Sequence, residues 1–403
     1  MKKAALHVHA GRTAVGLLAR STVEPDTVLF GYRPGTEAAG AVSLTMPVRV
    51  DQYDAMAGLL PIFEMNLPEG ALKERLRLQF AKAIPEFDDL DLLQIVGSSQ
   101  IGRLRYSPLE NLDEAVPAQD LAEVLTYRGT ADLFAHLLEC FARYSGVSGM
   151  QPKVLVREDL PLDKISYRGT THIVKTFDRA QYPELAANEF ICTRGAAAAG
   201  LAVPNLALSE NRKLLVIERF DLGADGNYLG LEDFCVLDGR RGHGRYDGSY
   251  EQIARRIKDF VSPALVRQSL QQLALMVTYS CGVGNGAAHR KNFSVLYRDP
   301  EGEVSLSPAY DIVSTLLYLP RDTLALELGG TKAFPDRARL LKFVREVTGK
   351  SAQSGQRLLD QAELGVNKAL DEAADYGRRH KAAATFVERL SRVLRSGLER
   401  LAA

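Results

Sequence analysis

The hydrophobic period of this 403-residue chain changes near residue 220, and the change limits the folds open to it. Before this point, short apolar runs alternate with polar residues or stand between turn signals, a pattern typical of strands joined by short helices. After it, long segments repeat apolar residues at helical spacing, among them a long apolar helix at 265–281. A chain that is mixed first and helical later predicts an α+β protein with two lobes.

The expected elements follow from these periods and from the Gly and Pro turn signals between them. A hairpin is expected around Ala10-Gly11, with strands at 6–10 and 13–18. Further strands are expected at 28–32, 41–50, 101–106, 153–156, 172–177 and 214–220. Helices are expected at 71–83, 121–125, 131–144, 184–200, 265–281, 337–347, 352–374 and 382–401.

Composition excludes several classes of protein. Fifty basic and fifty acidic residues give a net charge of zero, which argues against a broad nucleic-acid-binding surface. The four cysteines lie far apart without the spacing of a zinc site, and residues such as Cys192 and Cys281, which stand in apolar runs, are expected to be buried thiols. Because the chain shows no signal-like start and no run of ~18 apolar residues, we expect a cytoplasmic protein without membrane contact.

Two segments carry groups suited to phosphate. The Gly-containing loop 145–153 precedes a strand, and its small residues could wrap a polyphosphate or simply form a surface turn. Lys175 ends an apolar strand, where it could reach water or bridge phosphates. Glu189 follows at the start of an apolar run, where a carboxylate could orient that ammonium group.

Three further segments complete the pattern. The apolar strand 214–217 stops at Glu218, which suggests a linker that could receive an adenine, or a core strand with a surface turn. Asn292 is followed nineteen residues later by Asp311, and both supply the oxygen ligands that Mg²⁺ prefers. The common order of these segments favours an ATP- and Mg²⁺-dependent phosphotransferase over five unrelated turns.

In this order the segments resemble the HipA-type serine/threonine protein kinases, the toxins of bacterial type II toxin–antitoxin modules. The matching motifs are SGMQPK, THIVK, NE, VIERFD, LEDF, HRKNFS and PAYDIVS, with LPEG at 67–70. The resemblance covers nearly the whole chain and implies a bilobal protein-kinase-like fold. It places an extra β-rich N-terminal subdomain at 1–110, the kinase N-lobe with Gly-rich loop and hinge at 111–221, and the helical C-lobe with catalytic and metal-binding loops at 222–403.

The resemblance also implies roles for single residues. The phosphate-covering loop would be Ser148, Gly149, Met150 and Gln151, with Lys153 after it. Lys175 would contact the phosphates, with Glu189 behind it. Glu218 and Phe220 would lie at the adenine, and Asp221 would lie at the ribose. His289 would lie in the catalytic loop, and Asn292 and Asp311 would hold Mg²⁺.

The same resemblance implies partners and a biological role. The family suggests an aminoacyl-tRNA synthetase as the protein substrate, with translation and growth arrest and persistence as outcomes. It suggests a helix-turn-helix antitoxin, HipB-like, through which the kinase meets operator DNA. A small-molecule phosphotransferase of the aminoglycoside-kinase type shares part of the layout, but the loop at 145–153 and the β-rich N-terminus argue against it.

Two positions depart from the family pattern. Where the family's D-x-H-x-K-N loop has its catalytic aspartate, this chain has Ala287, which cannot accept a proton. The chain is therefore expected to be inactive, either through a deliberate substitution or as a natural pseudokinase that binds ATP or its antitoxin. Where the family often has a phosphorylated serine, this chain has Gly146, so we expect autophosphorylation of an active form on Ser148, unless Ser148 only supports the turn.

Overall fold

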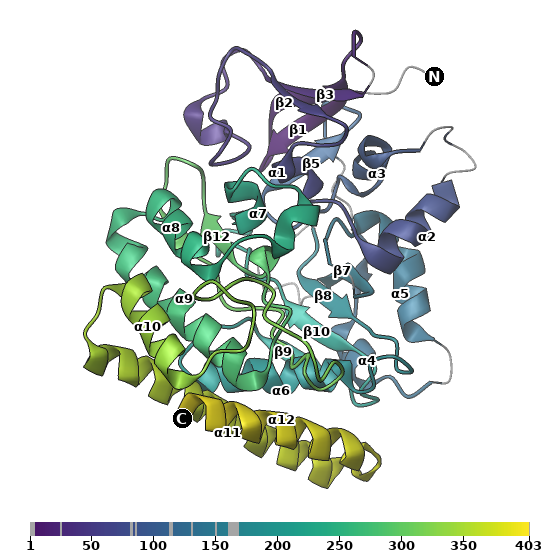
Figure 1. The fold of residues 1–403 in the computed structure, drawn as a ribbon. Coiled ribbons are helices and arrows are strands. Elements are labelled where there is room, and N and C mark those ends of the chain that lie inside the picture. The colour runs from purple at the N-terminus through teal and green to yellow at the C-terminus, as the bar shows by residue number, and fades with distance from the viewer. Residues whose placement is uncertain are drawn as a thin grey trace. The chain divides into compact units, whose positions relative to one another are not determined.

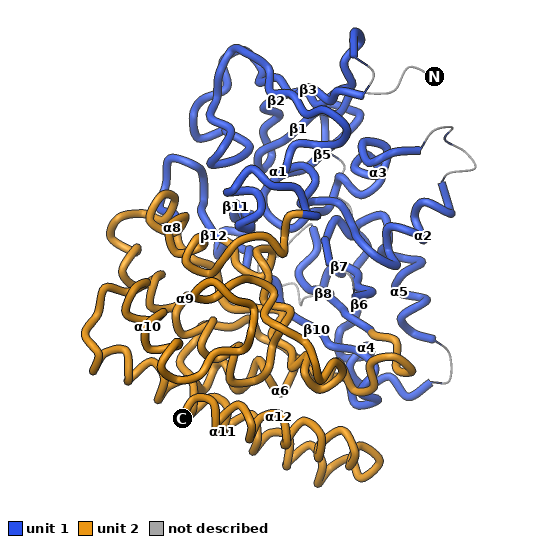
Figure 2. The backbone as a smooth tube through the Cα atoms, in the orientation of Figure 1, with its two compact units in different colours: residues 1–176, 209–243, 295–304 blue, residues 177–208, 244–294, 305–403 orange. Residues whose placement is uncertain are grey.

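A computed structural model describes residues 5–24, 26–80, 84, 87–112, 116–129, 132–149, 151–159 and 169–402. The elements are numbered in chain order, and Figure 1 labels most of the helices and strands. Figure 2 shows that the chain forms two compact units. Unit 1 comprises residues 1–176, 209–243 and 295–304, and unit 2 comprises residues 177–208, 244–294 and 305–403. Among the described residues, no helix combines the length and the apolar character needed to cross a membrane.

The first sheet of unit 1 is antiparallel and has the strand order β4-β3-β2-β1-β5. Its strands are β1 (Leu6–Ala10), β2 (Thr13–Arg20), β3 (Thr27–Tyr32), β4 (Tyr53–Met56) and β5 (Leu104–Ser107). The predicted hairpin is confirmed, because Ala10 pairs with Thr13 and Gly11 takes a positive φ of 62° at the turn.

The strand predicted at 41–50 is wrong, because this segment is a loop that contains only an isolated bridge among its described residues. Side chains bind the backbone N–H groups that a strand would use. The Val42 amide donates to the Tyr32 hydroxyl at 2.9 Å, and the Leu44 amide donates to the Glu232 carboxylate at 2.8 Å. Pro47 offers no amide hydrogen at all, so no regular ladder can form here.

Three helices pack with this sheet around one apolar core: α1 (Pro61–Glu64), α2 (Gly70–Phe80) and α3 (Asp89–Val96). Short turns of 3₁₀ helix occur at η1 (Ala38–Gly40) and η2 (Ala142–Tyr144). Phe30, Phe63 and Tyr106 meet edge to face or tilted at the centre of this core. Such aromatic contacts add to the hydrophobic burial that stabilises the sheet.

A second sheet carries the predicted phosphate-binding segments. Within unit 1 it runs β6 (Ala118–Gln119), β7 (Lys153–Glu158), β8 (His172–Lys175) and β10 (Leu215–Glu218) in that order. Helices α4 (Leu121–Thr126) and α5 (Leu133–Phe141) pack on it. Val154, Val174 and Val216 lie in its fully or almost fully buried core, as expected for β-branched residues in a central sheet.

A third, three-stranded sheet has the order β11 (Gly230–Asp233), β12 (Ser294–Tyr297) and β13 (Val304–Leu306). Helix α7 (Phe234–Leu237) follows β11 directly, and the 3₁₀ turn η3 spans Gly242–Tyr246. The side chain of Asp233 caps α7 by accepting the amides of Cys235 and Val236.

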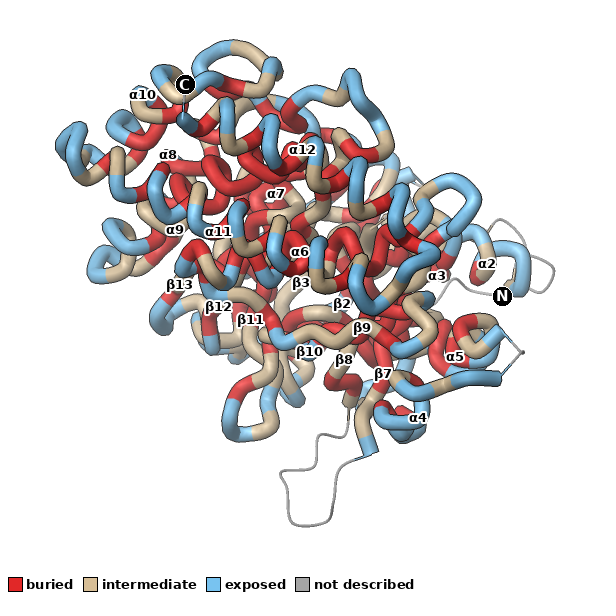
Figure 3. Tube along the Cα trace, turned by 90° about the horizontal axis from the view of Figure 1, so that it is seen from below, coloured by how far each residue is buried: buried red, intermediate tan, exposed pale blue. Residues whose placement is uncertain are grey.

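Unit 2 is mainly helical, as the period after residue 220 predicts. Its elements are α6 (Leu185–Ala198), β9 (Leu206–Leu208), α8 (Tyr250–Phe260), α9 (Pro263–Val283), η4 (Arg290–Asn292), α10 (Arg337–Thr348), α11 (Ala352–Arg379), η5 (Lys381–Ala383) and α12 (Ala384–Ala402). Buried and exposed residues alternate along α11 and α12 in Figure 3, as in amphipathic helices that cover a core.

The long helix α9 lies at the centre of unit 2 and delivers the chain to the candidate active site. Proline begins it, and Gly284 ends it in the left-handed conformation with a φ of 68°. From Ser269 to Val283 almost every residue is buried, since α8, α10, α11 and α12 all pack against α9.

Candidate active site

In unit 1, two lysines lie opposite each other on neighbouring strands. Lys153 of β7 pairs in register with Lys175 of β8, so both side chains leave the same face of the sheet. Each lysine is only 5% exposed. The Lys153 ammonium donates to the Ser148 carbonyl at 3.1 Å. This hydrogen bond holds the glycine loop next to the face of the sheet that carries the two lysines.

The loop fits tightly against Lys153. Gly149 has a φ of 120°, and a Cβ at this position would lie 2.2 Å from the Lys153 Nζ. The φ of 120° would strain any other residue, so glycine is what allows the loop backbone to follow this path beside the ammonium group. Positive charge and a glycine backbone together fit a phosphate group. Gln151 lies beside this loop, whereas Met150 lies outside the described residues.

Ser145 anchors the start of the loop. Its hydroxyl donates to the Phe141 carbonyl at 2.7 Å and accepts the Leu155 amide at 2.9 Å, and the residue is completely buried. Ser148 is partly exposed, three residues further on. Of these two loop serines, only Ser148 can present its hydroxyl to another molecule without breaking the fold.

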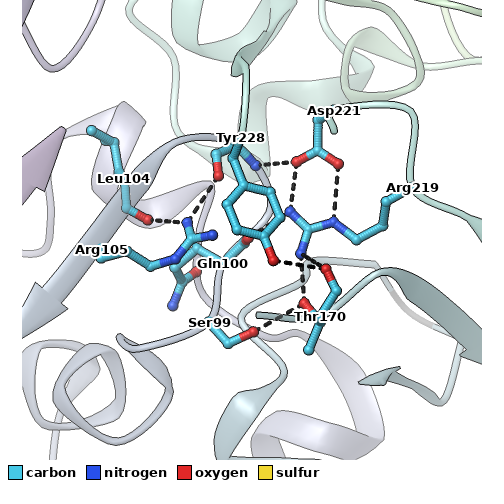
Figure 4. A network of polar contacts seen from close by, with 9 residues as sticks. Ser99, Gln100, Leu104, Arg105, Thr170, Arg219, Asp221 and Tyr228 are labelled. Atoms are coloured by element: carbon cyan, nitrogen blue, oxygen red, sulfur yellow. Dashed lines mark hydrogen bonds and ion pairs between the residues drawn. The ribbon is translucent and has the colours of Figure 1, made fainter. Parts of the chain in front are cut away.

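The predicted nucleotide linker begins where β10 ends. Glu218 is exposed at the last position of β10, opposite His172 of β8, and Phe220 is half-buried. Asp221 is 2% exposed. Its carboxylate accepts from the Arg219 guanidinium at 3.0 and 2.6 Å, and from the Gly102 amide at 2.6 Å (Figure 4).

This ion pair belongs to a larger buried network. Arg219 also donates to the Gln100 carbonyl and to the Thr170 hydroxyl, at 2.8 and 2.6 Å. The Tyr228 ring in Figure 4 receives two guanidinium groups, Arg105 at 4.3 Å and Arg219 at 4.4 Å from its centre. Because three donors already bind this buried carboxylate, a ribose hydroxyl would have to compete with Arg219 and Gly102 for its oxygens.

In unit 2, helix α6 carries Glu189, which is 3% exposed. The preceding residue, Asn188, is fully buried. The structure assigns Lys175 to unit 1 and Glu189 to unit 2. The pairing of these two side chains therefore stays a prediction.

The catalytic-loop segment follows α9. The Asn285 side chain accepts the Ala287 amide at 2.9 Å, and the Tyr250 hydroxyl donates to the Ala288 carbonyl at 3.0 Å. Asn292 accepts the His289 amide on its Oδ1 at 3.1 Å, which closes the loop on itself. The backbone at residue 287 is thus held on both sides, although the side chain there is a methyl group.

His289 is neutral in this environment. Burial first and the Arg245 guanidinium second lower the pKa of its imidazole to about 4, although the Asp311 carboxylate opposes the shift. The Tyr246 ring packs edge-on against the imidazole, with centroids 5.2 Å apart. A neutral imidazole can bind a cofactor or orient a loop at pH 7 without adding charge.

Asp311 is held beside this loop by the residue before it. The Tyr310 hydroxyl donates to the Lys291 carbonyl at 2.8 Å and lies 2.5 Å from the Ser294 hydroxyl. Asp311 itself takes a φ of 55°, which is unusual for a residue other than glycine. Strained backbone of this kind is concentrated at functional sites.

Asn292 and Asp311 fit a Mg²⁺ ion that is shared with a nucleotide. Mg²⁺ is commonly bound by one or two protein oxygens together with substrate phosphates and water. In the described part of the chain, no three His, Cys, Asp or Glu side chains form a metal-binding group. The binding of Mg²⁺ by Asn292 and Asp311 stays a prediction, and two oxygen ligands are of the number that Mg²⁺ takes from a protein when phosphates and water supply the rest.

The structure thus brings the predicted residues together in two groups. Unit 1 gathers Ser148, Gly149, Gln151, Lys153, Lys175, Glu218 and Phe220 on or beside one sheet, and unit 2 gathers Ala287, His289, Asn292 and Asp311 on two adjoining loops. The sequence analysis did not identify the structural roles of Arg219, which binds Asp221, and of Asn188, which precedes Glu189 on α6. The sequence could have pointed to these two residues only because each stands next to a predicted site residue.

Comparison with known protein families gives two matches that together span most of the chain. The model described as HipA N-terminal domain matches residues 6–107, and the model described as HipA-like C-terminal domain matches residues 145–375. The second match alone covers more than half of the chain and contains every predicted site residue.

Individual relatives agree with these models. Y4mE of Sinorhizobium fredii, which carries the provisional name of a kinase, is 30% identical over 69% of this chain and 69% of its own length. Y4dM of the same organism, named in the same way, is 29% identical over 80% of this chain and 75% of its own length.

A solved structure shares the fold. It comes from a complex of Shewanella oneidensis HipA with HipB and operator DNA, and it matches with a TM-score of 0.72. The match covers 98% of this chain and 97% of that chain at 20% sequence identity. The predicted α+β, kinase-like fold is therefore confirmed.

Proposed function

Because the chain belongs to the HipA family, we propose that it is a toxin-type protein kinase that transfers the γ-phosphate of ATP to a serine or threonine hydroxyl. The observation that carries the proposal is the loop arrangement in unit 2. There the Tyr310 hydroxyl binds the Lys291 carbonyl and holds Asp311 beside the turn that ends at Asn292. These two residues supply the oxygen ligands that phosphoryl transfer requires for Mg²⁺.

The residues of unit 1 would hold the nucleotide. Lys153 and Lys175 present positive charge on one face of the sheet, and Gly149 allows the loop backbone to approach a phosphate. Glu218 and Phe220 would receive the adenine through their backbone groups. When bound, ATP supplies the phosphoryl group and Mg²⁺ neutralises its charge. Asn292 and Asp311 would hold that ion. His289 would support the catalytic loop and, because its imidazole is neutral, would not repel the Mg²⁺ ion.

The missing step is proton acceptance. The substrate hydroxyl needs a carboxylate at position 287 to accept its proton and orient it, and Ala287 has none. We expect phosphotransfer by this chain to lie about 10³-fold or more below that of an aspartate-containing form. The fold around position 287 is intact, so the side chain alone is lacking.

The experiment compares this chain with its Ala287→Asp variant, using labelled ATP and Mg²⁺. Transfer to proteins of a bacterial lysate that appears only with Ala287→Asp supports the kinase, and the labelled band identifies its substrate, which we propose to be an aminoacyl-tRNA synthetase. In the active variant we expect autophosphorylation on Ser148 and none on Ser145, because Ser145 is buried and doubly hydrogen-bonded. Peptide mapping by mass spectrometry distinguishes the two serines.

Ala287 also favours a second function, that of a natural pseudokinase which binds ATP or an antitoxin and acts as a co-repressor. No transfer by either form, with ATP still bound, would contradict the kinase and support this alternative. The Shewanella relative was solved with HipB and operator DNA, which supports a helix-turn-helix antitoxin and DNA as partners for either function. Copurification with such an antitoxin tests this part separately.

A further inference from the structure

We infer that Asn188 and Thr315 are positioning residues that couple helix α6, the Asp311 segment and the catalytic loop of unit 2. Neither residue is among those that the family motif assigns to ATP or Mg²⁺. The coupling is visible in the folded chain itself, whereas its effect on phosphotransfer rests on the proposed function. All contacts involved lie within unit 2.

Asn188 fixes α6 to the Asp311 segment. Its Nδ2 donates to the Ser314 carbonyl at 3.0 Å, and its Oδ1 accepts the Ser314 amide at 2.9 Å. Both residues are completely buried. Two hydrogen bonds to a single residue set orientation as well as distance. Because Glu189 follows Asn188 on the helix and Asp311 stands three residues before Ser314, this clasp relates the positions of both carboxylates.

Thr315 fixes the same segment to the catalytic loop. Its amide donates to the Gly284 carbonyl at 2.9 Å, and its hydroxyl oxygen accepts the Gly286 amide at 2.8 Å. The hydroxyl hydrogen is given to the Asp322 carboxylate. Position 287 follows directly, so the Thr315 hydroxyl determines where the catalytic side chain begins.

The approach at Gly286 is close enough to require glycine. A Cβ there would lie 2.2 Å from Asp322 Oδ2 and 2.5 Å from the Thr323 carbonyl oxygen. Asp322 is kept in place by the Thr323 amide, which donates to its Oδ1 at 2.9 Å. The backbone at Gly286 therefore packs against the Asp322 carboxylate. The Thr323 amide binds one oxygen of this carboxylate, and the other oxygen accepts from the Thr315 hydroxyl and orients it.

The two clasps are joined by one peptide unit, because Ser314 and Thr315 are consecutive. A trans peptide is planar and stiff, so a displacement of α6 at Asn188 should displace the Gly284–Gly286 backbone by a similar amount. Asn188 and Ser314 are completely buried and Thr315 is partly buried, and packed, hydrogen-bonded contacts of this kind tend to move as a unit. Without the clasps, residue 287 and Asp311 would vary independently, and phosphoryl transfer is sensitive to such misplacement.

The first test needs no activity and uses this chain as it is. Hydrogen exchange by mass spectrometry would follow peptides that cover residues 185–192, 284–292 and 311–316. Thr315→Val should speed exchange in 185–192, and Asn188→Ser should speed exchange in 284–292. Among the described residues, Thr315 makes no hydrogen bond to the first of these segments and Asn188 makes none to the second. The matched control is Thr278→Val, which removes a fully buried hydroxyl that has no hydrogen-bond partner among the described residues.

If each variant speeds exchange only in the peptides that it contacts, the two clasps are independent and the inference is wrong. Changes in the distant peptides that also occur in Thr278→Val would overturn it as well, since they would report general loosening. If Asn188→Ser fails to fold, Thr315→Val with its readout at 185–192 still decides the question.

The second test adds the reaction, in the Ala287→Asp background. Thr315→Val should lower kcat about 10- to 100-fold and raise the Mg²⁺ concentration needed for half-maximal rate, with Thr315→Ser recovering most of the loss. Unchanged kcat in Thr315→Val would overturn the effect on catalysis. If Ala287→Asp is itself inactive, the kinase proposal fails, and the exchange experiment still decides the coupling.

Discussion

The buried partners of Asp221, Arg219 and the Gly102 amide, keep its carboxyl group ionised. Burial alone would raise the pKa of its carboxyl group, yet the pKa is lowered because Arg219 and the Gly102 amide favour the carboxylate. The ribose contact that the motif implies competes with these partners. A single sequence does not show this competition, because Gly102 and Thr170 join the network from distant positions.

We expect Arg219→Met to lower the free energy of unfolding by about 3–5 kcal/mol, because it leaves the Asp221 charge buried without its partner. Arg219→Met with Asp221→Leu should be more stable than Arg219→Met alone. The control is Arg298→Met, which breaks an exposed pair with Asp225 and should cost at most ~1 kcal/mol. Urea unfolding measures all three; equal losses for Arg219→Met and Arg298→Met would contradict the expectation.

His289 should make stability depend on pH below neutrality. Its pKa is about 4 in the folded chain against an ordinary value of 6.5, chiefly because the imidazole is buried. As pH falls from 6.5 towards 4, the unfolded chain takes up a proton here that the folded chain refuses, so stability is lost in that window. His289→Gln should therefore lose less stability between pH 7 and pH 4.5, measured by urea unfolding. The same loss in both proteins would show that His289 titrates normally.

At the scale of elements, α6 is held by close contact with α11 and α9. A Cβ on Gly195 would lie 2.2 Å from the Tyr279 hydroxyl and 2.7 Å from the Gly365 carbonyl oxygen. Only glycine lets the two helix backbones come this near. Because α6 also carries Asn188 and Glu189, helix packing and site geometry depend on the same element.

Gly195→Ala should push α6 away from α11 and lower the free energy of unfolding by about 1–3 kcal/mol, since the nearest atoms belong to backbone and a buried tyrosine. In the Ala287→Asp background it should also lower kcat. Gly355→Ala on α11 is the matched control, because its Cβ would meet nothing closer than 3.7 Å and should leave stability equal or improved. A similar loss in both variants would exclude a specific contact at Gly195.

Sequence periods predict most elements of this fold but not the contacts that complete its site. The strands β7, β8 and β10 and the helices α6, α9, α10, α11 and α12 follow from apolar spacing, because burial imposes that spacing, whereas α8 was not predicted. The loop at 41–50 could not be predicted, since its amides bind side chains from Tyr32 and the distant Glu232. For the same reason, the clasp of Asn188 on Ser314, 126 residues away, has no signal in one sequence.

At the scale of the molecule, Glu232 joins three remote segments of unit 1. It is completely buried and accepts from the Ser43 hydroxyl at 2.6 Å, the Leu44 amide at 2.8 Å and the Tyr297 hydroxyl at 2.5 Å. The N-terminal β-rich region is thereby fastened to β11 and β12. The division predicted at residue 110 stays a prediction, while the compact unit extends beyond it.

We expect Tyr297→Phe to destabilise unit 1 by about 1–3 kcal/mol, because it leaves one Glu232 oxygen short of a donor in a buried position. Tyr53→Phe is the control, since its hydroxyl bonds the Pro47 carbonyl at an exposed site and should matter less. Hydrogen exchange of peptides from 41–46 locates the effect. Unchanged protection there would mean that Glu232 does not hold the N-terminal region.

The interleaving of the two units also sets the timing of their completion during synthesis. Unit 1 takes its last segment from residues 295–304, and unit 2 takes its last from residue 305 onward. A ribosome that adds ~5–20 residues per second needs about 6–25 s to pass from residue 176 to residue 304. During that interval the nascent chain carries the glycine loop and both lysines without the complete segment 295–304 that finishes their unit. The synthesis of residues 295–304, more than a hundred residues after residue 176, thus decides when the first residues belong to a complete unit.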